Sequence, residues 1–159
     1  MITHLGLQPE LHPDERTRHA IAATGRYFVN RTATAVIATY RYYRDDWGVH
    51  AHTPELRLIQ EAGDGVEVGV RYRFHRQDAA DFALANYTGT EMLRTDDTKL
   101  TAFDSHTLEG KLSILGEVFG LGGRWAGVRA EGLLQYVAQD NDFGNAIVAQ
   151  AALTFPFTY

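Results

Sequence analysis

The sequence predicts an all-β fold, an antiparallel up-and-down transmembrane β-barrel with about seven or eight strands in this chain, alone or as part of a larger or multi-chain barrel. Apolar and polar residues alternate along most of the chain, and breaks rich in Gly, Asn and Asp separate the alternating runs. Aromatic residues make up 11% of the chain, which has 15 glycines and only 4 prolines. That composition is typical of strands and turns rather than of helices.

The start of the chain is predicted to be an N-terminal extension or linker over residues 1–18, with the barrel strands in residues 19–159. The stretch at residues 8–18 is polar and interrupted by prolines, which favours a loop. The first 20 residues lack the basic start, apolar stretch and small-residue cleavage site of a secretory signal. The chain is therefore either soluble or a piece of a longer protein whose export signal lies further upstream.

Three early strands are predicted near residues 19–28, 32–44 and 49–60, with faces that alternate less cleanly than those further along the chain. Tight breaks separate the predicted strands, because Gly, Asn and Asp tolerate the positive φ angles that hairpin turns require. These breaks lie at residues 29–31, 45–48, 61–65, 120–123 and 140–145.

Alternation is strictest in the later strands, beginning with residues 66–75, where every second side chain is apolar. Further strands are predicted at residues 107–118, 124–137 and 147–159. The polar segment at residues 77–105 is the exception to this pattern. A connection of that length between strands is usually functional or extracellular, so we expect an extracellular loop.

An internal repeat supports a meander of hairpins. Residues 52–58 and 106–112 share an initial His-Thr pair, a Glu, a basic residue and a final Leu, and a Gly-Val-Arg string recurs at 69–71 and 127–129. The repeating unit is one hairpin, as expected of an up-and-down barrel.

Charge and composition exclude several classes of function. The formal net charge is −5, which argues against nucleic acid as a partner. The chain has no cysteine, which removes thiolate metal sites and cysteine nucleophiles. The longest apolar runs, such as residues 146–149, are far shorter than the roughly 20 residues of a membrane helix. No helix of this chain is therefore expected to span a bilayer.

Alternation alone does not say whether the apolar faces meet a protein core or lipid, but three features favour lipid. The chain ends on alternating aromatic residues, Phe155, Phe157 and Tyr159, which resemble the terminal assembly signal of bacterial outer-membrane barrels. Counting strands back from that end places the long segment outside and short turns at the periplasm. Aromatic residues then gather at both interfaces, with Tyr40, Tyr42, Tyr43, Trp47, Phe74 and Tyr136 at the outer end and Tyr27, Phe28, Phe119, Trp125, Phe155 and Phe157 at the inner end.

The polar faces carry charges of both signs, and these are expected to line the barrel interior. They would form ion pairs across a narrow lumen or the polar wall of a wide pore, whereas in a soluble sheet they would face water. The predicted lumen-lining residues are Arg41, Glu55, Arg57, Glu67, Arg71, Arg73, Glu109, Lys111, Glu117, Arg129 and Glu131.

Smaller constellations have stronger structural explanations. His50 and His52 share a strand face, but histidines near a turn more often bond to backbone and water than to a metal. The acids of the long segment lack the ordered ligand loop of a calcium site. Ser105 and His106 are neighbours in a strand and point to opposite faces, which argues against a catalytic triad. We therefore expect no catalytic residue, no metal and no cofactor.

The string Tyr40-Arg41-Tyr42-Tyr43-Arg44-Asp45-Asp46-Trp47-Gly48-Val49, followed by His52-Thr53-Pro54-Glu55-Leu56, resembles a family of uncharacterised bacterial proteins, domain of unknown function 3570, that are predicted to be outer-membrane β-barrels. Further matches at residues 12–19, 71–82 and 103–108 extend the resemblance over most of the chain. The resemblance implies a fold and a location but no activity, and it transfers no catalytic residue. Family members are longer, with an export signal and additional strands, so it also implies that this chain is a C-terminal portion.

Together these features predict a passive porin-like pore or structural barrel in the bacterial outer membrane, without catalysis. The expected partners are outer-membrane lipid and lipopolysaccharide, the barrel-assembly machinery and other chains that complete the barrel. Bacterial barrels normally have an even number of strands. An odd count would need a strand near residues 1–7, strands upstream or several chains. The alternative is a soluble lipocalin-like or β-sandwich module that binds a small ligand.

Overall fold

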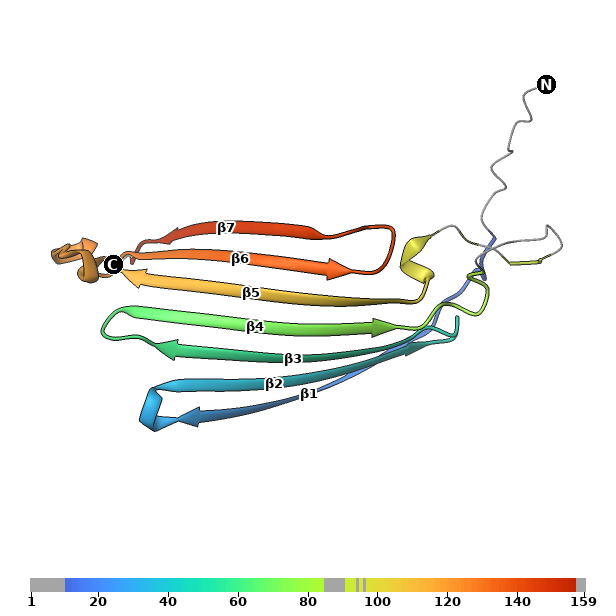
Figure 1. The fold of residues 1–159 in the computed structure, drawn as a ribbon, viewed down its shortest axis with the longest axis horizontal. Coiled ribbons are helices and arrows are strands. Elements are labelled where there is room, and N and C mark those ends of the chain that lie inside the picture. Colours follow the sequence, from blue (N-terminus) through green and yellow to red (C-terminus); the bar gives the residue numbers. More distant parts are fainter. Residues whose placement is uncertain (1–10, 85–90, 94, 96, 157–159) are drawn as a thin grey trace, which may run out of the picture.

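A computed structural model describes residues 11–84, 91–93, 95 and 97–156. Within them, seven strands form one antiparallel sheet whose spatial order is the sequence order, which confirms the predicted all-β up-and-down arrangement (Figure 1). The strands are β1 (Arg18–Val29), β2 (Thr34–Asp45), β3 (His50–Glu61), β4 (Val66–Gln77), β5 (Phe103–Leu115), β6 (Arg129–Gln139) and β7 (Ala146–Thr154). No helix in the described part of the chain is long and apolar enough to cross a membrane.

The sheet is open. Among the described residues each strand pairs only with its neighbours in sequence, so β1 and β7 each have one unpaired edge there. The part of the chain that the structure describes therefore does not close into the predicted barrel. The physical reason is that hairpins supply only local pairing, whereas closure needs a partner for both edge strands.

The pairing register divides the strands into two faces, because residues opposite each other on neighbouring strands point to the same side. One row of paired residues, for example, runs from Leu58 through Val70, Gly110 and Leu134 to Ala149. We call the side that carries this row the apolar face. Its large exposed hydrophobic residues are Ile21, Tyr27, Tyr40, Leu56, Leu58, Val68, Val70, Tyr72, Leu108, Leu112, Leu134, Tyr136, Ile147 and Leu153.

The opposite side, the polar face, is the more enclosed one. Thr53, Thr107 and Ser113 lie on it and are buried, Ser113 to 1% exposure, whereas Leu134 on the apolar face is 59% exposed. Side chains crowd on the concave side of a curved sheet and spread apart on the convex side. The polar face is therefore concave, and the hydrophobic residues are turned outward.

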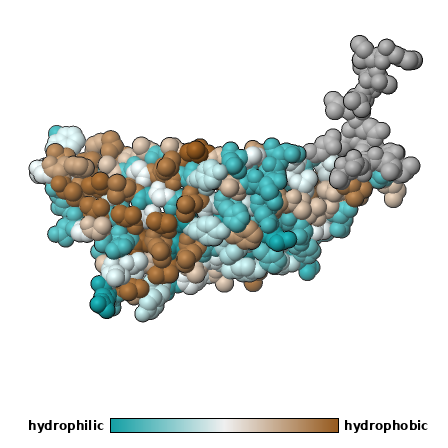
Figure 2. All heavy atoms as spheres, in the orientation of Figure 1, coloured by the Kyte–Doolittle hydropathy of each residue, from teal (hydrophilic) through white to brown (hydrophobic). Residues whose placement is uncertain are grey.

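Hydropathy also changes along the strands. On the side drawn in Figure 2, hydrophobic residues gather over the left and centre of the sheet, and hydrophilic residues over the right, where the long β4–β5 connection lies. The charged and histidine residues among the strand positions of the apolar face all lie at this end. They are His19, Arg44, His50, His52, Arg76, Asp104 and His106.

The connections differ in part from the expected pattern of short turns at one end and long loops at the other. The longest connection, between Gln77 and Phe103, lies at the same end as the β2–β3 turn. At the opposite end, however, β5 and β6 are joined by residues 116–128, which include the 3-10 turns Gly116–Phe119 and Gly123–Trp125. The asymmetry between the two ends therefore rests on the β4–β5 connection.

This wide β5–β6 connection corrects two sequence predictions. The strand expected from residue 124 begins at Arg129, and Glu117, expected on a strand face, lies in a 3-10 turn. The Gly116 amide donates to the Val128 carbonyl (2.7 Å), and a Cβ on Gly116 would lie 2.1 Å from the Trp125 carbonyl oxygen. The chain therefore folds back on itself here more closely than a side chain would allow.

Candidate functional site

All the predicted lumen-lining residues except Glu117 lie on the concave polar face. Glu117 is exposed in the β5–β6 connection instead. The polar face therefore gathers the charges that the alternation assigned to it from five neighbouring strands, β2 to β6.

Arg71 on β4 is the centre of the largest charge network on this face. Its Nη2 donates a very short hydrogen bond to Oε2 of Glu109, and its Nη1 lies 3.5 Å from Oε2 of Glu55. Arg57 stands directly opposite Arg71 in the register, which would be repulsive between two strands. Glu55 offsets this repulsion, since its other carboxylate oxygen lies 3.3 Å from Nη2 of Arg57.

The network also explains the internal repeat. The repeat places His-Thr and Glu at equivalent positions of β3 and β5, which are the two strands that flank β4. Consequently Glu55 and Glu109 approach Arg71 from opposite sides, and Thr53 and Thr107 are both buried beside them.

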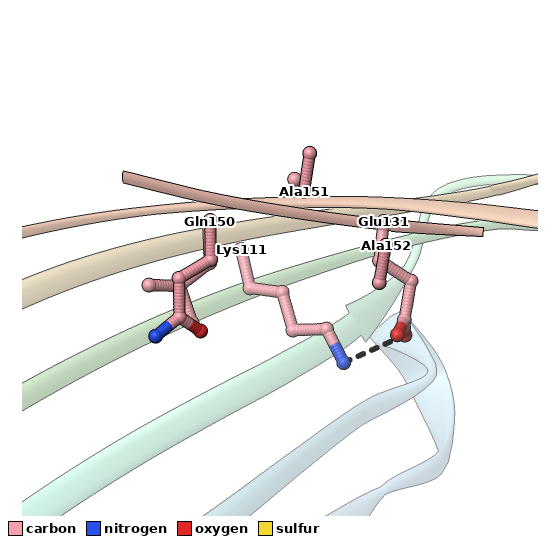
Figure 3. A pocket seen from close by; sticks show the side chains of 7 residues that line it. Lys111, Glu131, Gln150, Ala151 and Ala152 are labelled. Carbon is pink, nitrogen blue, oxygen red and sulfur yellow. Dashed lines mark ion pairs between the residues drawn. The ribbon is translucent and has the colours of Figure 1, made fainter. Parts of the chain in front are cut away.

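A second group of polar contacts lies near the β6–β7 edge. Nζ of Lys111 is 2.8 Å from Oε1 of Glu131, and Nη1 of Arg129 donates to Oγ of Ser113 (3.0 Å). Figure 3 shows Lys111 and Glu131 on the same side of the sheet as Gln150, around a hollow, while Ala151 points to the other side. The two faces thus remain distinct to the edge of the sheet.

Several arginines on the polar face lack this compensation. Among the residues that the structure describes, Arg41 and Arg73 form no ion pair with a carboxylate, and Arg41 lies over the Tyr43 ring at 5.8 Å. Both lie in the halves of their strands nearest the long β4–β5 connection. Arg18, Arg26 and Arg129 on the same face likewise form no ion pair with a carboxylate within the described ranges. Because Arg26 and Arg129 lie at the opposite end of the sheet, the polar face has mixed charge overall and unpaired positive charge toward both ends.

At the end of the sheet nearest the long β4–β5 connection, Asp45, the last residue of β2, holds three segments together. Its carboxylate accepts hydrogen bonds from Nε of Arg16 (2.8 Å), from the Tyr43 hydroxyl (2.7 Å) and from the backbone amides of Trp47 and Val49 (3.1 and 3.0 Å). Burial of this carboxyl raises its pKa, but the hydrogen bonds from Tyr43 and Arg16 outweigh burial and hold the pKa below its ordinary value.

Hydrophobic side chains complete this assembly, which we call the cap. Val49, Ala80, Phe82 and Leu100 form a buried cluster, which the ring of Trp47 joins through an edge contact with Phe82 (5.3 Å between centroids). The guanidinium of Arg16 lies 4.4 Å from the centre of the Trp47 ring, and the His12 ring stacks on the same indole. The segment expected to be a linker is therefore packed against the β2–β3 turn.

Gly48 completes the β2–β3 turn within the cap. Its φ is +85°, in the region that favours glycine, and a Cβ at this position would lie 2.2 Å from a carboxylate oxygen of Asp81. The Tyr-Arg-Tyr-Tyr-Arg-Asp-Asp-Trp-Gly string thus combines the end of β2 with the turn that anchors the cap.

The predicted rings of aromatic residues are present only in part. Tyr40, Tyr42, Tyr72, Phe74 and Tyr136 lie on the apolar face near the end with the cap. Tyr43 and Trp47, which were expected beside them, belong to the cap. At the other end Tyr27 is on the apolar face and Phe28 on the polar face, and the rings of Trp125 and Phe155 meet edge to face at 6.3 Å. Phe157 and Tyr159 lie outside the described residues.

The weaker constellations gain no geometric support. No group of three or more His, Asp or Glu that could hold a metal occurs within the described ranges, which leave out Asp96. The Nδ1 atoms of His50 and His52 are bonded to the hydroxyls of Tyr42 and Tyr40.

Comparison with known proteins gives a family without a function. A family model described as "Protein of unknown function (DUF3570)" matches residues 3–141, and its description names neither a fold nor a location. The search of curated proteins gave no match. The search of solved structures gave none either.

Proposed function

Because the chain belongs to the DUF3570 family, whose description gives no activity, we propose a function from the geometry: the chain forms part of a β-barrel in the bacterial outer membrane. It acts there as a passive porin-like pore or a structural barrel, without catalysis. The observation that supports this proposal is the division of the sheet into an exposed hydrophobic face and a more enclosed face that carries ion pairs.

Such an orientation is costly in water and favourable in lipid. Soluble proteins rarely expose a continuous apolar patch larger than a few hundred Å². Here the exposed hydrophobic residues extend across all seven strands, from Ile21 on β1 to Leu153 on β7. In an outer-membrane barrel this is the expected arrangement, since the outward face meets acyl chains and the interior is polar.

The length of the apolar face fits a bilayer. On β4 it runs from Val66 to Phe74, which is about 26 Å at roughly 3.3 Å per residue. A strand tilt of about 40° reduces this to a height of about 20 Å, close to the ~25 Å apolar band of outer-membrane barrels.

The soluble alternative needs the opposite orientation. A lipocalin-like module encloses an apolar interior and holds its ligand there. In this sheet the concave face carries the network around Arg71 and the Lys111–Glu131 pair. A small apolar ligand would find few apolar contacts on that side.

The unpaired edges of β1 and β7 require partners in this environment, because an unsatisfied backbone group in hydrocarbon costs several kcal/mol. We propose that further strands, from the same protein or from other chains, pair with both edges and close the barrel. Lipid and lipopolysaccharide would surround it, and the barrel-assembly machinery would read the terminal signal proposed for Phe155, Phe157 and Tyr159.

Extraction tests the proposal. In cells that express the protein, we expect it in the outer-membrane fraction and in the detergent phase on phase separation, with a gel mobility that changes on heating. A monomer that stays in solution without detergent would contradict the proposal. Conductance in planar bilayers then separates the two versions, since stepwise currents indicate a pore, and a folded barrel that gives no current at any voltage indicates a structural barrel.

A further inference from the structure

The apolar face ends in a band of basic and imidazole side chains beside the cap. His19, Arg44 and His50 stand opposite one another on β1, β2 and β3, and His52 and Arg76 do so on β3 and β4. Together with His106 on β5 they form what we call the cationic band. Asp104, opposite Arg76, is the single carboxylate among the strand positions of the apolar face.

Tyrosine hydroxyls hold three of the band's histidines in place. The Tyr40 hydroxyl is 2.5 Å from Nδ1 of His52, and the Tyr42 hydroxyl is 2.9 Å from Nδ1 of His50. The Tyr72 hydroxyl is 2.8 Å from Nδ1 of His106. In the tautomer in which the phenol donates to Nδ1, the ring proton lies on Nε2. In that tautomer each of these three imidazoles presents an N–H donor that has no partner among the described residues.

The guanidinium groups of the band are also available. Arg44 is exposed and forms no ion pair within the described ranges. Nε of Arg76 lies 3.8 Å from Oδ1 of Asp104, and its side chain is 65% exposed. Such a long, solvent-accessible pair contributes little to stability, so Arg76 can exchange it for a stronger acceptor.

The position of the band indicates which acceptor this is. A molecule that covers this surface must present apolar chains to the leucines and valines of the apolar face. It must also present several negative charges to the cationic band, next to Tyr40, Tyr42 and Tyr72. The opposite end of the apolar face carries no charged strand residue, so the acceptor is expected at one interface only. Arginine binds phosphate with paired hydrogen bonds, and tyrosines occupy the headgroup level of membranes.

We propose that the cationic band binds the phosphate groups of lipopolysaccharide in the outer leaflet. This inference rests on the proposed function, because it needs the apolar face to meet lipid. It adds the side chains that recognise the lipid, and it assigns the end of the sheet with the cap to the cell surface.

The chain offers a matched control on the same two strands. Arg41 and Arg73 precede Arg44 and Arg76 by three positions and therefore point to the opposite, polar face. The full chain, folded in detergent, is titrated with lipid A that carries both phosphates, and binding is followed by native mass spectrometry. We expect R44Q/R76Q to bind at least about tenfold more weakly than the wild type, and R41Q/R73Q to bind like the wild type.

Each remaining outcome decides the proposal. The proposal is overturned if R44Q/R76Q binds lipid A as tightly as the wild type, or if both double variants lose affinity equally. It is also overturned if the wild type binds lipid A without phosphates, or phosphatidylglycerol, as tightly as lipid A with both phosphates. If R44Q/R76Q does not fold, H52Q/H106Q replaces it, with the same expected direction. Absence of the chain from the outer-membrane fraction and from the detergent phase contradicts the proposed function, whereas a protein that folds in detergent and ignores lipid A contradicts this inference alone.

Discussion

Replacing Leu134 by arginine is expected to destabilise the folded protein in a bilayer by about 2–4 kcal/mol, the cost of arginine at the midplane of a lipid-facing strand. Leu134 lies near the middle of the apolar face, is 59% exposed, and stands between Gly110 and Ala149. These small neighbours leave room for the longer side chain, and neither offers a carboxylate. The loss of folding free energy would therefore measure whether the apolar face meets lipid, rather than a steric clash of the arginine with its neighbours.

The matched control is the preceding residue. Leu133 has the same side chain but points to the polar face, between Lys111 and Gln150 and beside Glu131. L133R is expected to fold with less than half the loss of L134R. Urea unfolding in lipid vesicles, followed by the heat-modifiable gel band, gives both values. An L134R protein as stable as the wild type would mean that the apolar face does not meet lipid.

Replacing Asp45 by asparagine is expected to loosen the cap. The variant keeps the size of the side chain but loses the charge that accepts from Arg16, Tyr43 and two backbone amides. Hydrogen bonds to a charged group contribute about 1.5–3 kcal/mol, so a loss of about 2 kcal/mol, or roughly thirtyfold in the opening equilibrium, is expected. Hydrogen exchange at the Trp47 and Val49 amides measures it directly.

The same loss should appear in the wild type at low pH. The pKa of Asp45 is lower in the folded protein than in the unfolded chain, so its contribution is complete above the unfolded pKa of about 4 and disappears as the pH falls through the folded value. Protection of the two amides, which is the exchange rate relative to that of the unfolded chain at the same pH, should thus be constant from pH 8 to 5 and approach that of D45N in acid. D46N is the control, because Asp46 receives one exposed bond, from the Thr17 amide. Equal effects of D45N and D46N would contradict this role of Asp45.

Strand alternation predicted the faces of the sheet well where side chains alternate without exception. Residues 66–75 lie in β4 with the expected division, and even Leu133, which interrupts the pattern of its strand, takes the face that its position requires. Backbone pleating alone decides this, whatever the residue type. The repeat likewise predicted a hairpin unit, and the two glutamates that it places around Arg71 give it a physical basis.

Contacts between distant segments were not predictable in this way. The bond from Arg16 to Asp45 joins residues 29 positions apart, and the Trp47–Phe82 contact depends on how the long connection folds back. At Gly116 the alternation continued in the sequence while the chain left the strand, because its missing side chain permits close approach to Trp125. Closure was overestimated for a related reason, since nothing in local patterning specifies what pairs with β1 and β7.

The most direct test of the outward-facing apolar surface uses the absence of cysteine in the chain. L133C and L134C each provide one attachment point for a nitroxide spin label, on adjacent residues and opposite faces. In lipid vesicles, the label at position 134 is expected to relax mainly through collisions with lipid-soluble oxygen, and the label at position 133 through contact with a water-soluble nickel chelate. The reverse pattern, or equal access of the chelate to both positions, would contradict a sheet that turns its hydrophobic face to lipid.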